Sequence, residues 1–345
     1  MAGNAGGKTR GRARPRVKTM EQFAQASGVS RPTVSRYFND PECVRPATRA
    51  RIERALKALH YSPNLFATNF NRKSPRMFAV IVPSLTDPFY ANLVEQVESY
   101  ALLEGYWTIV LTSHGEAAME ARAIRMLMSL RVAGAAVAPL GLSSDLALLK
   151  ELGEAGPLVL LDSRVDVDAA FVGGDNMQSV ALIVDYLQRT GEPPCFFDMP
   201  NVNRNASERR AAYIKAMQAF GAEPWVIPAP SPSWALEAAG CEQAERYFAQ
   251  GAPRRTILCA TDRGAFGVLA AANRRGLRIG RDGDFRVAGH DDHPLSRFAC
   301  PSLTTVAQDS AEMARRAVNL LAARVDGPRE APCLLEARLV MRESA

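Results

Sequence analysis

The chain has 345 residues and a mass of 37.5 kDa, too large for one ordinary core, so two or three domains are expected. Hydrophobic residues make up 47% of it, which excludes general disorder, yet no apolar run reaches the roughly 18 residues of a membrane span. The net charge is +6, the basic first residues show no secretory signal, and six widely spaced cysteines indicate reduced thiols, so we expect a cytoplasmic protein.

The N-terminal fifth of the chain is strongly basic. Residues 1–76 hold 16 Lys and Arg against 4 Asp and Glu, whereas the rest of the chain is acidic. Residues 1–18 alternate Gly, Ala and basic residues without apolar periodicity, which predicts a disordered basic arm. A basic region joined to an acidic body indicates a nucleic-acid-binding head, and a merely solvated basic tail is the alternative.

A helix-turn-helix is predicted at the start of residues 19–61. Thr19 can cap a first helix, and the small Ala24 leaves room for a second helix to cross closely. Gly28 follows four residues later and permits a tight turn, and Val34, six residues beyond it, can pack the second helix onto the first. This spacing indicates a DNA-binding domain whose second helix enters the major groove.

The second helix would present its outward side chains to DNA. Arg31 and Arg36 are suited to paired hydrogen bonds with guanine, whereas the hydroxyls and amides beside them suit phosphate oxygens. The predicted DNA contacts of the head are Thr19, Ser30, Arg31, Pro32, Thr33, Ser35, Arg36 and Asn39. A third helix over 47–60 would complete its core. An ordinary helical hairpin with a charged outer face is the alternative.

Residues 62–76 form a polar, proline-bounded linker, and residues 77–345 alternate short apolar runs with helical segments. The expected strands are 78–83, 107–112, 135–139, 158–162, 195–199, 225–228, 257–260 and 286–291. The expected helices between them include 92–104, 117–130, 262–275 and 311–325. Apolar strands that alternate with helices predict an α/β core of parallel sheets, and its length predicts two similar subdomains with a cleft between them.

Taken in order, these motifs resemble the lactose-repressor (LacI/GalR) family of bacterial transcriptional regulators. They are GVSRPTVSRYFN, VRPATRARIERALKALHYSPN, IVPSLTDPFY, DN at 175–176, ERRAAY at 208–213, GHDDHPL at 289–295 and PSLTTV at 301–306. The resemblance implies a repressor that binds a roughly palindromic DNA operator as a homodimer. It also implies two Rossmann-like subdomains like those of type I periplasmic binding proteins, with a small effector between them.

The resemblance gives the linker over 62–76 a role as a hinge helix that forms on the operator. Its DNA contacts would be Asn64, Ala67 and Phe70. Phe70 stands where the family usually has leucine, and an aromatic wedge can also kink a base step from the minor groove. The alternative is that Phe66 and Phe70 pack the head against the core.

The family's ligand residues carry over to positions around the predicted cleft. The expected effector contacts are Phe89, Tyr90, Asp162, Arg209, Trp234, Thr261 and Asp291. The aromatic rings would stack on the effector, and the fork of Arg209 would grip hydroxyls or a carboxylate. Thr261 replaces a usual asparagine and His290 an aromatic, so the effector is expected to be sugar-like or another small polar metabolite. Each residue also has an ordinary alternative, as a helix cap, core residue or surface ion pair.

Other functions fit the motifs less well. An enzyme would need a phosphate loop, nucleophile elbow or metal motif that the sequence lacks, and His290 and His293 have no further ligands at zinc spacing. We therefore expect no cofactor and no metal. A solute-binding transport protein would need export, and it would not explain the DNA-binding head. A terminal heptad tail that would argue for a tetramer is also absent.

Overall fold

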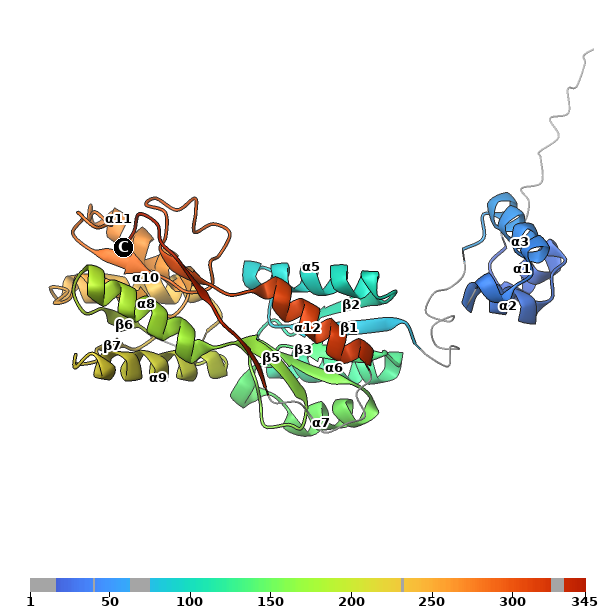
Figure 1. The fold of residues 1–345 in the computed structure, drawn as a ribbon, viewed down its shortest axis with the longest axis horizontal. Coiled ribbons are helices and arrows are strands. Elements are labelled where there is room, and N and C mark those ends of the chain that lie inside the picture. The colour runs from blue at the N-terminus through green and yellow to red at the C-terminus, as the bar shows by residue number, and fades with distance from the viewer. Residues whose placement is uncertain (1–16, 40, 63–74, 231–232, 324–331) are drawn as a thin grey trace, which may run out of the picture. The chain divides into compact units, whose positions relative to one another are not determined.

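The computed structural model describes residues 17–39, 41–62, 75–230, 233–323 and 332–345. Contacts divide the chain into two compact units, Met1–Pro75 and Arg76–Ala345. The first unit contains the helix-turn-helix and the second contains the α/β core (Figure 1). Among the described helices, none is long and apolar enough to cross a bilayer.

The head consists of short helices around a small aromatic core. They are α1 (Met20–Ser27), α2 (Arg31–Asn39), the 3₁₀ turn η1 (Pro41–Cys43) and α3 (Pro46–Leu59). Thr19 and Gln22 form a capping box at the start of α1, and Gly28 ends this helix at φ 65°. Phe23, Val34 and Ile52 are fully buried, so the spacing predicted from the sequence does lock the helices together.

The first subdomain of the core is a parallel sheet covered by helices on both faces. Its strands are β1 (Met77–Val82), β2 (Trp107–Thr112), β3 (Gly134–Val137), β4 (Leu158–Leu161), β5 (Ala170–Gly174) and β11 (Cys333–Leu335). Its helices are α5 (Pro88–Leu103), α6 (Ala117–Leu130), α7 (Leu146–Ala155) and α12 (Ser310–Ala323), with the 3₁₀ turn η2 (Gly141–Ser143). Over the described residues the strand order is β11-β5-β4-β3-β1-β2.

Alternation along β1 explains this layering. Phe78 and Val80 pack into the cluster formed with α5 and α12, whereas Ala79 and Ile81 pack into the cluster formed with α6 and α7. Both faces of the strand are therefore buried, as the continuous apolar sequence predicts for a parallel sheet.

The second subdomain repeats this arrangement. It contains α8 (Asn176–Thr190), β6 (Cys195–Phe197), α9 (Arg204–Ala219), β7 (Val226–Ile227), α10 (Leu236–Ala249), β8 (Thr256–Cys259), α11 (Asp262–Arg274), β9 (Arg286–Ala288), β10 (Thr305–Ala307) and β12 (Arg338–Val340). In the described part of the chain, one parallel sheet has the order β7-β6-β8-β9, and β10 pairs with β12 in an antiparallel pair. Helices α8 and α9 cover one face of the parallel sheet, and α10 and α11 cover the other.

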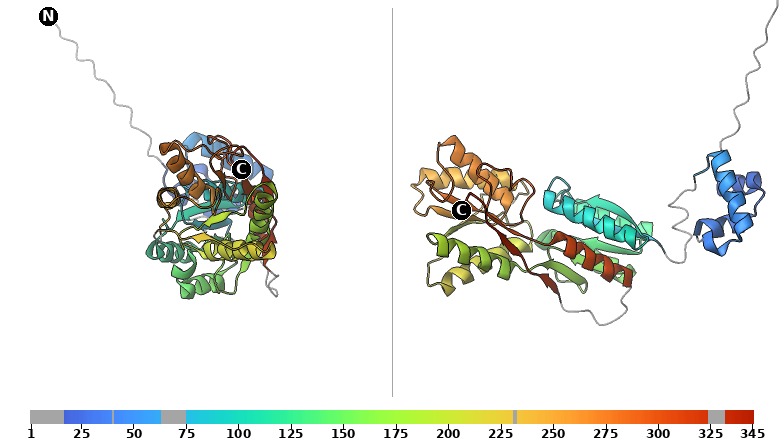
Figure 2. Two further views of the ribbon diagram at one scale, coloured as in Figure 1. Left: turned by 90° about the vertical axis from the view of Figure 1, so that its left-hand side faces the viewer. Right: turned by 45° about the horizontal axis from the view of Figure 1, so that its top comes forward.

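The chain passes between the subdomains after β5, after β10 and between β11 and β12, and α12 returns beside α5 (Figure 2). The α/β fold with two parallel-sheet subdomains is confirmed. The expected strands lie within a few residues of observed ones, but β5, β10, β11 and β12 were not predicted. Strand β5 ends in two glycines, and the other missed strands have three residues each, too few to show a period.

Candidate functional site

The outward face of α2 carries the side chains that the sequence singled out. Arg31, Pro32 and Arg36 are exposed, while Val34 between them is fully buried against α1. The Ser30 hydroxyl accepts a hydrogen bond from the backbone of Thr33 at 3.4 Å and caps the helix. The helix thus buries one face and exposes its first turn and two guanidinium groups to solvent.

A helix with this exposure suits DNA because its N-terminus favours anions and its arginines can reach base edges. Glu21 on α1 lies 3.4 Å from the Nε of Arg31, so the carboxylate neutralises part of this charge. The predicted contacts Asn64, Ala67 and Phe70, residues 1–16 of the basic arm and the side chain of Asn39 lie outside the described residues. Their roles stay predictions.

In the core, the cleft between the subdomains gathers polar side chains at the carboxyl ends of the parallel strands. Tyr90 donates a hydrogen bond to Oδ2 of Asp162 at 2.8 Å, and Asn205 of the second subdomain donates to the same oxygen at 3.0 Å. Burial raises the pKa of Asp162 to about 6, although Arg209 and these donors oppose the shift. Asp162 also has φ 59°, a strained conformation of the kind that clusters at functional sites.

Arg209 is the centre of a second polar network. Its side chain is 4% exposed and lies on α9. Nε donates to Oδ1 of Asn176 at 3.0 Å, Nη1 to the Ala260 carbonyl at 2.8 Å, and Nη2 to Oδ1 of Asp291 at 3.0 Å. The guanidinium is thus held in one orientation from three directions, and its charge is matched by Asp291.

Asp291 remains ionised in this network. Burial alone would raise its pKa, but the neighbouring Arg209 and His290 outweigh burial and hold the pKa at about 2. Oδ1 accepts hydrogen bonds from Arg209 and from Gln308, the latter at 2.9 Å. Within the described residues, Oδ2 accepts none. A negatively charged acceptor is therefore held in place with one oxygen available to a ligand.

That carboxylate lines a cavity of about 150 Å³ between the subdomains. Phe89 and Asn92 contribute from α5, Arg263 from α11 and Gln308 from the segment after β10. A 150 Å³ cavity is the size that accommodates one six-membered ring. The lining offers an aromatic ring for stacking, together with hydrogen-bonding groups.

Trp234 closes another part of the cleft. It belongs to the second subdomain, but its ring meets Tyr90 of the first subdomain edge to face at 6.4 Å and leaves no space for a Cβ at Gly115. Phe89 and Tyr90 are in turn 5.2 Å apart between ring centroids. The predicted aromatic residues therefore form one cluster that spans the cleft.

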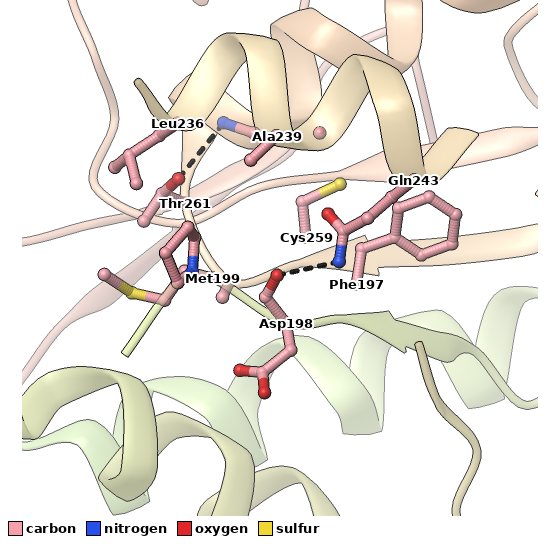
Figure 3. Close-up of a pocket in the computed structure, with 12 residues that line it drawn as sticks. Phe197, Asp198, Met199, Leu236, Ala239, Gln243, Cys259 and Thr261 are labelled. Carbon is pink, nitrogen blue, oxygen red and sulfur yellow. Dashed lines mark hydrogen bonds between the residues drawn. The ribbon is translucent and has the colours of Figure 1, made fainter. Parts of the chain in front are cut away.

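Thr261 lies apart from this group. Its hydroxyl caps α11 by accepting the backbone N–H of Gly264 at 3.1 Å, and it borders a narrow pocket beside Gln243 (Figure 3). That pocket has a volume of about 10 Å³, which is at the lower limit of what one water molecule requires. The structure thus gives Thr261 a structural contact, and its predicted effector contact stays a prediction.

The two histidines of the HDDH segment are engaged by the protein. His290 lies 2.9 Å from the Ser179 hydroxyl and 2.9 Å from Asp291, and burial and the Arg209 charge lower its pKa. Nδ1 of His293 accepts the backbone N–H of Leu295 at 3.0 Å. Among the described residues, no group of three His, Cys, Asp or Glu side chains is arranged to hold a metal ion.

Sequence reasoning missed several residues that support the cleft. Asn176, Asn205 and Gln308 orient the predicted carboxylates and Arg209, while Asp87 and Arg263 form an ion pair at 3.0 Å across the cleft. Asn176 belongs to the DN motif and Asp87 to TDPFY, so a sequence signal existed for these two. Asn205 and Arg263 carried none, because their partners are distant along the chain.

Two family models match the chain. Residues 19–64 match the lacI family of bacterial regulatory proteins, and residues 178–345 match a periplasmic binding protein-like domain. The similar curated proteins include the transcriptional repressor PurR of Haemophilus influenzae strain PittEE, at 26% identity over 90% of this chain and 91% of that protein. They also include the transcriptional repressor CytR of Escherichia coli K12, at 27% identity over 94% and 96% of the two chains.

Solved structures also resemble this chain over most of its length. The lac repressor dimer bound to operator and the anti-inducer ONPF has a TM-score of 0.79 and 25% identity, and the match covers 94% of this chain and 98% of that one. The curated relatives named above are repressors and not enzymes.

Proposed function

Because this chain belongs to the lacI family and is a DNA-binding transcriptional repressor with a periplasmic-binding-protein-like core, we propose that it binds a roughly palindromic operator as a homodimer under the control of a small polar effector. The observation that carries this proposal is that one chain has both an exposed recognition helix with two arginines and a cleft with the ionised carboxylate of Asp291. Oδ1 of this carboxylate is hydrogen-bonded within the protein, and Oδ2 is available to a ligand.

Sequence readout is assigned to Arg31 and Arg36 on α2, which stand clear of the head's core. Ser30, Thr33 and Ser35 lie beside them and suit the phosphates that set the register of the helix. The basic arm adds affinity for any DNA sequence, because each phosphate contact releases counterions. In the head, base readout therefore falls to the arginines of α2, and general affinity for DNA falls to the basic arm.

The homodimer is supported by large apolar side chains on the first subdomain. Leu102, Leu103 and Trp107, at the end of α5 and the start of the edge strand β2, are 59%, 81% and 62% exposed. Exposed apolar groups gathered in one place mark protein contacts more often than chance. A second copy that covers them would give the dimer two heads, one for each half-site of a palindromic operator.

The effector site is assigned to the cavity beside Phe89 and Asp291. A single-ring compound with hydroxyl or N–H donors would stack on Phe89 and donate to Oδ2 of Asp291. By linkage, effector and operator must change each other's affinity by the same factor, and about 1–3 kcal/mol is typical of such coupling. Equal effector affinity with and without operator would contradict this part of the proposal.

The decisive experiment is selection of bound sequences from a random duplex pool at physiological salt. A two-fold-symmetric enriched site is expected, and its two halves would each accommodate one recognition helix. Salt-sensitive retention of DNA without any enrichment would contradict sequence-specific readout. Enrichment of one isolated half-site would contradict the homodimer while leaving the readout intact.

A further inference from the structure

The guanidinium group of Arg263 is held within its own subdomain by paired hydrogen bonds to one carboxylate. Its side chain is 15% exposed and extends from the first turn of α11. Nε and Nη2 each donate to one carboxylate oxygen of Glu237 on α10, both at 2.7 Å, and Nη2 also donates to the Trp234 carbonyl at 3.1 Å. Paired bonds to one carboxylate fix a planar guanidinium in direction as well as position.

The remaining nitrogen of this guanidinium reaches across the cleft. Nη1 donates to Oδ2 of Asp87 at 3.0 Å, while Oδ1 of Asp87 caps α5 by accepting the Phe89 N–H at 3.0 Å. Burial raises the pKa of Asp87, and the charge of Arg263 opposes that shift. Separation of the subdomains would deprive a buried carboxylate of this compensating charge.

Arg263 also supports a second contact that crosses the cleft. It fixes the backbone of Trp234, whose ring lies against Gly115 and Tyr90 in the first subdomain. Arg263 and Asp87 both line the 150 Å³ cavity that Asp291 borders. Arg263 thus lines the cavity, forms the ion pair with Asp87 and holds the backbone of Trp234, whose ring makes the aromatic contact.

We propose that Arg263 is a positioning residue that helps to hold the two subdomains together across the cleft, through Asp87 directly and through Trp234 indirectly, in addition to the Asn205–Asp162 hydrogen bond. It makes closure depend on the contents of the cavity, because an occupant would lie beside an ion pair that favours the closed cleft. This role rests on the proposed effector site, but closure itself can be measured without effector or DNA.

The chain has three tryptophans, so Trp234 can be made the only fluorescent one. Trp107 and Trp225 are 62% and 37% exposed, and both tolerate replacement by phenylalanine better than a buried ring would. In this background, acrylamide quenching of Trp234 reports how often the cleft opens. Asp87→Asn and Arg263→Gln remove the cross-cleft charge pair from opposite sides.

We expect either substitution to raise the open population about tenfold, equivalent to about 1.4 kcal/mol, and to raise the quenching of Trp234 accordingly. The matched control is Arg275→Gln, which removes an ion pair of 2.8 Å between the residue that caps the C-terminus of α11 and Glu245 on α10, without crossing the cleft. Quenching in this control should equal that of the parent, and circular dichroism should show every variant folded.

Unchanged quenching in both Asp87→Asn and Arg263→Gln would overturn the proposal. A rise in Arg263→Gln alone would also overturn it, since Arg263 would then only tether Trp234 within its own subdomain. Within the part of the chain that the structure describes, Asp87 bonds to the Phe89 N–H and to Arg263 and makes no hydrogen bond with Trp234, so its variant separates these two cases. Failure of the operator selection would instead bear on the proposed function and would leave the quenching result standing.

Discussion

The head and the core place their charged functional side chains in opposite surroundings. In the head, Arg31 is 64% exposed, and its ion pair with Glu21 is equally open to solvent. In the core, Arg209 is 4% exposed and shares its hydrogen bonds with Asn176, Ala260 and Asp291. A readout residue can therefore change without loss of the fold in the head, whereas in the cleft Asp291, which lines the cavity, depends on the buried Arg209 that also stabilises the domain.

The largest expected effect tests this contrast directly. Arg209→Ala would leave the ionised Asp291 buried without its partner, and breaking a buried pair in this way costs about 3–5 kcal/mol. Urea unfolding of the core should show this loss, while Arg189→Ala, which breaks an exposed pair with Asp185 on α8, should change stability by less than about 1 kcal/mol. If Arg209→Ala lowered the free energy of unfolding no more than Arg189→Ala does, then the buried Arg209–Asp291 pair would not stabilise the core.

This contrast also explains how much of the molecule the sequence could predict. Local spacing determines the head, because Ala24, Gly28 and Val34 lie within eleven consecutive residues and decide how two short helices cross. The parallel strands were likewise visible as apolar runs. Asp87 and Arg263 meet across 176 positions of sequence, so no local pattern could pair them. Thr261 is itself the cap of α11, and local sequence could not separate this role from an effector contact, since cap and ligand roles favour the same residue types.

A second effect concerns pH and is confined to the cleft. Burial raises the pKa of Asp162 to about 6 in the folded core, whereas an unfolded aspartate titrates near 3.9. The folded state holds this proton more tightly, so stability should fall as pH rises from about 4 to about 6 and level off above that, by about 3 kcal/mol in total. Asp262, whose pKa burial raises to about 7, adds a slope of the same sign.

Asp162→Asn should remove its share of this slope while leaving that of Asp262. The measurement is the free energy of urea unfolding at pH values between 4 and 7. Asp185→Asn, at the surface of α8, provides the control and should retain the parent slope. If Asp162→Asn follows the parent curve throughout, then Asp162 does not carry the pH dependence.

A smaller effect is expected in the head, and it falls on specificity instead of stability. Arg31→Ala and Arg36→Ala should each lose about 1–3 kcal/mol of base discrimination. Their unfolding free energies should stay within about 0.5 kcal/mol of the parent, because both side chains are exposed. Deletion of residues 1–18 provides the opposite case, with weaker binding to all DNA and a shallower salt dependence. Equal losses on selected and random duplexes for all three variants would contradict the readout roles.

The smallest effect is expected from Glu21, the one acidic partner of Arg31 among the described residues. Their 3.4 Å contact is exposed on both sides, and such pairs contribute about 0–1 kcal/mol. Glu21→Gln should leave the ratio of selected to random DNA affinity unchanged and should strengthen binding to both at low salt, because a carboxylate leaves the phosphate-facing surface. Titrations at two salt concentrations measure both quantities. A loss of discrimination like that of Arg31→Ala would instead mean that Glu21 positions Arg31, and that the head, like the cleft, depends on a paired charge to hold its functional side chain.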